Sequence, residues 1–177
     1  MSTSSRGNAG LVRRLACRAC ELGADKAKVI DAGTIVTASW VRWKCQYGCG
    51  GYRKRLCCPP NTPTPEQTAQ MLSGYRRGVL MTVTGAKAAD ISKIAVALER
   101  EAFLAGCYKA FAFGAGPCRL CPKCDPAGRC RHPYEARPAM EACGIDVYAT
   151  VCGNGWKIEV VRSEDDIPNY FALTMIE

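Results

Sequence analysis

The sequence predicts one α/β or α+β domain, in which a mixed sheet carries helices on one side and cysteine-rich loops at one end. Helical and strand-like apolar patterns alternate along the 177 residues, a length that buries an ordinary core. Two cysteine-rich stretches follow predicted strands, so we expect them to form loops beside the sheet. We expect residues 1–8 to be a loose tail and residues 9–177 to form the single domain.

The first third of the chain predicts one helix followed by two short strands. Leucine and alanine recur with helical spacing between Leu11 and Leu22, and Gly23 stands where such a helix would end. The segments 26–30 and 35–41 are rich in β-branched and apolar residues and are predicted strands.

The clearest start of a helix is at Thr64. Thr64 is suited to be the N-cap, Pro65 suits the first turn, and Gln67 completes a capping box. We therefore predict a helix that runs to about residue 73, followed by an apolar strand over 78–84.

The strongest helical pattern covers residues 89–105 and ends at Gly106. The remaining predicted elements are a strand over 109–113, a short helix around Ala139, strands over 146–151 and 156–161, and an edge strand over 171–176.

The chain also contains an internal similarity. Residues 15–33 and 98–116, aligned without gaps, share Leu15/Leu98, Ala19/Ala102, Gly23/Gly106, Lys26/Lys109, Ala27/Ala110, Ala32/Ala115 and Gly33/Gly116. Small residues recur by chance in an alanine-rich chain, so chance and duplication both remain open. Duplication would bring the two cysteine loops from equivalent ends of the sheet, facing each other or side by side.

Four cysteines at positions 118, 121, 124 and 130 form a C-x2-C-x2-C-x5-C run. Zinc sites usually combine two separated C-x-x-C pairs, whereas iron–sulfur clusters favour three cysteines at this spacing and a fourth further on. The run departs from the ferredoxin pattern, in which the fourth cysteine follows after three residues and precedes proline. We interpret Cys118, Cys121, Cys124 and Cys130 as ligands of a 4Fe–4S cluster, with zinc as the alternative.

A second cysteine-rich region covers residues 45–58 and includes several glycines that suit a tightly wrapped loop. Cys45, Cys49 and Cys58 form a three-cysteine set that would hold a second cluster. Its fourth ligand stays open between Cys57, Cys143, a water and a substrate.

Several ordered motifs resemble one family. They are V-R-W-K-C-Q-Y-G-C, C-P-P-N-T-P-T-P-E, F-L-A-G-C-Y-K-A, G-A-G-P-C-R-L-C-P-K-C, C-R-H-P and A-R-P-A-M-E-A-C-G-I-D-V. Across about residues 15–160 the chain resembles the uncharacterised "predicted metal-binding" proteins, a domain of unknown function common in anaerobic bacteria and archaea. The resemblance implies a small cysteine-rich metal or iron–sulfur protein without a settled activity. It marks the same seven cysteines as recurring positions and leaves Cys57 out of the ligand set.

The other cysteines and the single histidine have two interpretations each. Cys17 and Cys20 are either a redox pair or small buried residues on a helix, and we favour burial. Cys107 and Cys152 flank predicted strands and are expected in the core. His132 is either a hydrogen-bond donor to a cluster sulfur or an ordinary loop residue.

The composition indicates a cytoplasmic protein. The amino terminus lacks the apolar segment of a secretory signal, and the longest apolar runs are too short to span a bilayer, so we expect no membrane association. Thirteen cysteines, an odd number, without an export signal are better explained as ligands than as disulfides.

The net charge of +8 is not gathered into one basic tract, so a nucleic-acid partner is not expected. A solvated basic surface, or one that docks an acidic redox partner, explains this charge at least as well as a nucleic-acid site does. No phosphate-binding loop, Ser/His/Asp set or dinucleotide fingerprint is present.

We therefore expect low-potential electron transfer to an anaerobic metabolic partner. The alternatives are a redox or Lewis-acid enzyme with an open iron site on the three-cysteine cluster, and a zinc-stabilised binding module. The oligomeric state is not predicted.

Overall fold

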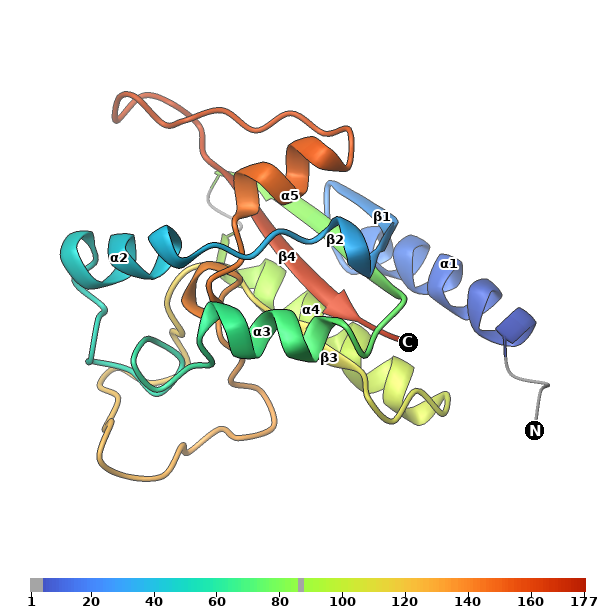
Figure 1. Ribbon diagram of the computed structural model, residues 1–177, viewed down its shortest axis with the longest axis horizontal. Coiled ribbons are helices and arrows are strands. Elements are labelled where there is room, and N and C mark those ends of the chain that lie inside the picture. The colour runs from blue at the N-terminus through green and yellow to red at the C-terminus, as the bar shows by residue number, and fades with distance from the viewer. Residues whose placement is uncertain (1–4, 86–87) are drawn as a thin grey trace.

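A central antiparallel sheet with helices on both faces organises the chain (Figure 1). The computed structural model describes residues 5–85 and 88–177. Its helices are α1 (Ser5–Glu21), α2 (Ser39–Gly48), α3 (Pro65–Leu72), α4 (Ala88–Leu104) and α5 (Val147–Gly153), with 3-10 turns η1 (Ala32–Thr34) and η3 (Glu141–Cys143). Its strands are β1 (Lys26–Asp31), β2 (Arg77–Thr84), β3 (Phe111–Phe113) and β4 (Asn169–Met175).

The strands pair in the order β1-β2-β4-β3 within the described residues, and every ladder is antiparallel. The α/β single domain is thereby confirmed, although the expected mixed sheet is antiparallel throughout. Residues 171–176 were predicted as an edge strand, and β4 instead lies inside the sheet. Its alternate side chains face two separate cores, because Phe171 and Leu173 join one core and Ala172 joins the other.

Two hydrophobic cores sandwich the sheet. The first lies under α1 and α4, where Leu15 and Leu98 pack against Val79 and Met81 of β2. The second covers the opposite face, where Leu72 of α3 and Val151 of α5 pack near Leu80 of the sheet, so helices cover both faces. Among the described residues, no helix has the length and apolar character needed to cross a bilayer.

Most predicted helix boundaries hold. Helix α3 begins with the expected capping box. The Thr64 hydroxyl accepts from the backbone N–H of Gln67, and the Gln67 side-chain oxygen accepts from the backbone N–H of Thr64. Gly23 and Gly106 follow α1 and α4 with φ of 110° and 98°, in the left-handed region that suits a residue without a Cβ. Helix α1 begins at Ser5, so part of the segment expected as a loose tail is helical, and residues 1–4 lie outside the described residues.

The strand predicted over 35–41 was wrong. Thr37 makes only an isolated bridge to Ile145, and helix α2 begins at Ser39. Val41 is the one buried residue of α2, which fits a helix that touches the domain along a single line. The strand predicted over 109–113 shortens to Phe111–Phe113.

The strands predicted over 146–151 and 156–161 were also wrong. The Asp146 carboxylate accepts from the backbone of Ala149 at 2.9 Å and so caps a helix, α5. Residues 156–161 form no strand, because Trp156 packs on Phe171 while Val160 is 62% exposed. The short helix expected around Ala139 is the 3-10 turn η3, which begins just after it.

The internal similarity coincides with a structural repeat. Each half runs helix, edge strand, cysteine loop, short helices and inner strand. Val79 pairs with Val29, and Thr174 pairs with Ala112, the residue aligned with Val29. Val79 and Thr174 also pair with each other at the centre of the sheet. The two halves are therefore related by an approximate two-fold axis through this central pair.

Strands β1 and β3 run in opposite directions because each ladder between them is antiparallel. The two cysteine loops therefore do not leave the sheet at one end. The segment after β1 crosses the sheet to reach α2, with Ala38 donating to Gly144 at 2.9 Å on the way. As a result the two loops lie side by side, as seen at the lower left of Figure 1.

Candidate metal centre

The first cysteine loop is anchored by Arg42 of α2. Its Nη1 donates to the carbonyls of Pro63 at 2.5 Å and Ala142 at 3.1 Å, so one guanidinium ties α2 to both α3 and η3. Thr68 of α3 donates to the carbonyl of Cys143 at 2.7 Å and closes the same corner. These contacts hold the last turn of α2, which carries Cys45, against η3.

Cys45, Cys49 and Cys58 lie together at this corner. A Cβ built on Gly51 would lie 3.5 Å from Cys49 Sγ and 3.7 Å from Cys58 Sγ, so both sulfurs border the same glycine. The backbone N–H of Gly51 also donates to Cys49 Sγ at 3.4 Å. The structure thus brings together the three-cysteine set that the sequence singled out.

Burial is the main cause of the thiol pKa shifts in this set. It raises the pKa of Cys58 to about 11, the charge of Cys49 adds to the increase, and Arg55 opposes it. The pKa of Cys45 is raised by burial first and then by the charge of Cys49. The charge of Cys49 therefore disfavours ionisation of Cys45 and Cys58, a repulsion that a bound cation would relieve.

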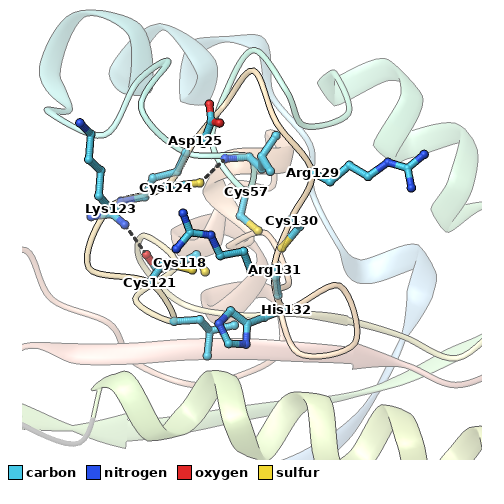
Figure 2. Close-up of a pocket in the computed structure, with 14 residues that line it drawn as sticks. Cys57, Cys118, Cys121, Lys123, Cys124, Asp125, Arg129, Cys130, Arg131 and His132 are labelled. Atoms are coloured by element: carbon cyan, nitrogen blue, oxygen red, sulfur yellow. Dashed lines mark hydrogen bonds between the residues drawn. The ribbon is translucent and has the colours of Figure 1, made fainter.

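The second cysteine loop encloses a pocket (Figure 2). Cys118, Cys121, Cys124 and Cys130 all line it and are partly buried. In the close-up these four side chains gather on the inner side of the loop, whereas Lys123 and Arg129 extend away from it. The four cysteines predicted to act together therefore share one site.

A fifth thiol, Cys57, enters this pocket from the first loop. Arg55 Nη1 donates to the carbonyl of Cys118 at 2.8 Å, and the backbone N–H of Leu56 donates to Cys124 Sγ at 3.5 Å. Burial raises the pKa of Cys57 to about 12, and the charge of Cys118 and a hydrogen bond with it are the next causes. The two loops are thus joined at the thiols themselves.

Sequence reasoning left Cys57 out because the family resemblance pointed to Cys58 alone. The available signal was the Cys57–Cys58 doublet before two prolines. In the structure this doublet lies in a turn, where the Cys58 N–H donates to the carbonyl of Arg55 at 3.1 Å. Here Cys58 borders Gly51 and Cys57 lines the second pocket, so one doublet serves both thiol groups.

The thiols of the two loops do not converge on one position where a single ion would bind. Within residues 5–85 and 88–177, no three His, Cys, Asp or Glu side chains are gathered closely enough to hold one metal ion. The five thiols of the second pocket nevertheless all line one small volume.

Cys143, a candidate fourth ligand of the first set, is fully buried in the second core. Burial raises its pKa to about 12, and the nearby charges of Cys45 and Glu141 add to the shift while Arg42 opposes it. The Cys143 thiol is therefore near Cys45 but enclosed in the core, and burial favours its protonated form.

The remaining cysteines are free thiols. Cys107 is buried as expected, but Cys17, Cys20 and Cys152 are exposed, so the expectation of burial was wrong for these three. All three lie on the outer surface of a helix, where a small residue needs no partner.

His132 lines the second pocket, and its Nδ1 lies 3.7 Å from a Glu135 carboxylate oxygen. Arg131 also lines this pocket, and the charge of Arg137 acts on Cys57 from outside it. The two arginines would offset part of the negative charge of a thiolate cluster.

A larger cavity of about 690 Å³ adjoins the first thiol set. Cys45, Cys49 and Cys58 form part of its wall, and residues of α2, η3, α5 and the segments 115–117 and 158–171 form much of the rest. The three-cysteine set thus borders a space of the size that small molecules occupy in proteins.

Comparison with curated proteins and with solved structures found no match for the chain. A family model described as "Predicted metal-binding protein (DUF2284)" matches residues 28–176. The matched region includes both thiol groups, most of β1 and the whole of the other three strands. With this match over most of its length, the chain belongs to that family of cysteine-rich, predicted metal-binding proteins.

Proposed function

We propose that this chain is an iron–sulfur protein. Cys118, Cys121, Cys124 and Cys130 would hold one 4Fe–4S cluster, and Cys45, Cys49 and Cys58 would hold a second. The observation that carries the proposal is that five thiols from two loops line the second pocket. The donor set fits the group, because iron–sulfur clusters are held by cysteine thiolates.

The spacing of the cysteines along the sequence, C-x2-C-x2-C-x5-C, favours a cluster over a single zinc ion. Zinc binds its four thiolates at about 2.3 Å, which requires the sulfurs to converge on one atom. The thiolates of a cubane bind different irons and stand further apart. Four cysteines spread along one loop that lines a single pocket suit the second arrangement.

Backbone hydrogen bonds to sulfur give further support. Gly51 N–H donates to Cys49 Sγ at 3.4 Å and Leu56 N–H donates to Cys124 Sγ at 3.5 Å, so each thiol group receives one. Such bonds stabilise thiolate charge and raise the reduction potential of a cluster. When bound, a cluster accepts and returns single electrons, and we propose that an unidentified redox protein is the partner.

We place this activity in the reducing cytoplasm of an anaerobe, since all thirteen cysteines are free thiols.

The test is the iron, acid-labile sulfide and zinc content of protein prepared without oxygen. We expect about eight irons with matching sulfide for two clusters and no stoichiometric zinc. Cys121→Ala should remove the iron held by Cys118, Cys121, Cys124 and Cys130. Cys49→Ala should remove the iron held by Cys45, Cys49 and Cys58. Cys152→Ala, an exposed cysteine on α5, is the matched control and should keep all iron. One zinc per chain without sulfide would overturn the proposal in favour of a zinc-stabilised module.

A second candidate function is an enzyme that uses the three-cysteine set. The observation that favours it is the cavity against Cys45, Cys49 and Cys58, because a cluster with three thiolates leaves one iron for an outside ligand. Brief oxygen exposure should remove the iron of this set first, since a cluster with four thiolates is the better protected. Loss of all iron in one phase would mean that Cys45, Cys49 and Cys58 hold no separate cluster.

A further inference from the structure

The cavity beside the first thiol set has the build of a small-molecule site. Its volume of about 690 Å³ lies within the range of ligand pockets, and its wall is mostly apolar. The large apolar side chains on this wall include Trp40, Val41, Val147, Tyr148, Val160 and Phe171. Trp40 and Tyr148 are 45% and 41% exposed, so their aromatic faces are available inside the cavity.

The three thiols form one part of the cavity wall. Cys49 is exposed, Cys45 is partly buried and Cys58 is buried, so a molecule in the cavity would meet the set from one side. Gly51 also lines the wall and leaves the two sulfurs beside it uncovered. A ligand bound here would therefore lie against the thiol set.

One cation on the wall has no protein partner. Lys44 lines the cavity beside Cys45 and makes no hydrogen bond or ion pair within the part of the chain that the structure describes. The Asp146 carboxylate lines the same wall but is engaged by the backbone of Ala149. Glu141 lies on the η3 side, so an anionic ligand would place its charge toward α2.

We propose that this cavity binds a small aromatic carboxylate. Its ring would lie against Trp40 and Tyr148, and its carboxylate would pair with the ammonium of Lys44. The inference rests on the proposed function in one respect, because only a metal at the three-cysteine set would make the bound molecule a substrate. The binding site itself depends only on residues of the cavity.

Isothermal titration of full-length, anaerobically prepared protein with benzoate tests the proposal. Benzoate should bind, and benzyl alcohol and benzylamine should bind at least tenfold more weakly, because they lack the carboxylate. Lys44→Met should weaken benzoate binding at least tenfold without changing the binding of benzyl alcohol. Trp40→Ala should weaken both. Lys93→Met is the matched control, since Lys93 pairs with Asp90 on α4, across the sheet from the cavity.

The proposal is overturned if benzoate does not bind at millimolar concentration, if Lys44→Met binds it as the wild type does, or if benzyl alcohol or benzylamine binds equally well. Iron content is measured on the same samples. Benzoate binding without iron would support the cavity and overturn the clusters, and iron without benzoate binding would do the reverse. Melting temperatures of the variants should match the wild type, since both side chains are on the surface of α2.

Discussion

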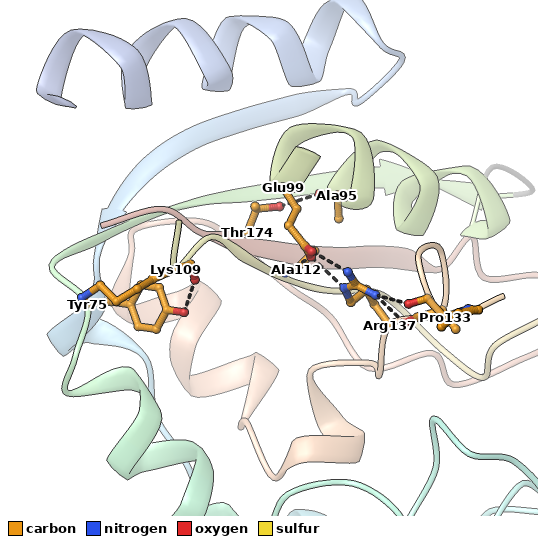
Figure 3. Close-up of polar contacts among 9 residues, drawn as sticks. Tyr75, Ala95, Glu99, Lys109, Ala112, Pro133, Arg137 and Thr174 are labelled. Carbon is orange, nitrogen blue, oxygen red and sulfur yellow. Dashed lines mark hydrogen bonds and ion pairs between the residues drawn. The ribbon is translucent and has the colours of Figure 1, made fainter. Parts of the chain in front are cut away.

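Arg137 donates to both carboxylate oxygens of Glu99 and thereby ties the end of the second cysteine loop to helix α4 (Figure 3). The Nε–Oε2 distance is 2.7 Å, and the same oxygen accepts from the backbone of Ala112 in β3 at 2.7 Å. The two side chains are only 16% and 14% exposed, so the pair is shielded from water. One carboxylate therefore connects α4, β3 and the loop.

Removing one partner of this pair should be costly. Arg137→Ala leaves a largely buried carboxylate without its cation, which we expect to lower the free energy of unfolding by about 3 kcal/mol. Because the loop end is released, iron of the second group should be lost faster than in the wild type. Urea unfolding and timed iron release measure the two effects.

The exposed pair Lys93–Asp90 is the control for the Arg137 prediction. Its side chains are 72% and 62% exposed, so Lys93→Ala should change the unfolding free energy by less than about 0.5 kcal/mol. Equal effects of the two substitutions would show that the Glu99 pair has no special role.

Gly144 holds the corner where the first thiol set meets η3. Its φ is 78°, and a Cβ at this position would lie 2.5 Å from Cγ of Pro65. Gly144→Ala should therefore destabilise the domain by about 1–3 kcal/mol, because the alanine would be strained at a positive φ and its Cβ would overlap the Pro65 ring. Thermal unfolding measures the loss.

Gly153→Ala offers the matched comparison. Gly153 closes α5, has no atom within 4 Å of a built Cβ, and takes no left-handed conformation. Alanine there should be neutral or slightly stabilising. If both alanine variants unfolded at the wild-type temperature, Gly144 would not constrain the corner.

The predictable part of the fold is the part governed by local rules. The capping box at Thr64 and the stop at Gly106 depend on nearby residues only, and both were predicted. The segment 146–151 has a strand-like pattern, but the Asp146 side chain fixed a helix start that apolar alternation does not reveal. Pairing partners far apart in sequence decide whether a strand is inner or edge, which is why β4 was misplaced.

The thiol groups were predictable for the same reason. Regular spacing placed Cys118, Cys121 and Cys124 around one pocket, because spacing acts locally. The position of Cys57 depends on how two loops about 60 residues apart in the chain meet, and the Cys57–Cys58 doublet alone does not encode that meeting.

Cys57 should act as a hydrogen-bond donor to the second group instead of as a ligand. The four cysteines of the second loop already supply a full set of cluster ligands, and Cys57 is hydrogen-bonded to Cys118 at a place where burial raises its pKa to about 12. Cys57→Ala should therefore keep the iron content and lower the reduction potential, because a donor to a ligand sulfur is lost. Cys57→Ser, which keeps a donor, should restore part of the potential. Loss of half the iron in Cys57→Ala would instead make Cys57 a ligand.

The buried thiol of Cys143 should make stability depend on alkaline pH. Its pKa in the folded chain is about 12, above its ordinary value of 9.0, and burial is the main cause. As the pH rises past about 9, the unfolded chain loses this proton while the folded chain keeps it. The contribution of the protonated thiol to stability is thus complete below pH 9 and is lost by pH 12, at about 1.4 kcal/mol per pH unit.

Urea unfolding of wild type and Cys143→Ala at several values between pH 8 and about pH 11 measures this dependence. Chelator-treated protein is used, so that bound metal does not set the stability. Lysine and tyrosine residues titrate in the same range in both proteins, so the informative quantity is the difference between the two unfolding free energies. That difference should be constant below pH 9 and shrink above it, because only the wild type carries the buried thiol. Parallel curves across the whole range would mean that the Cys143 thiol titrates alike in the folded and unfolded chains.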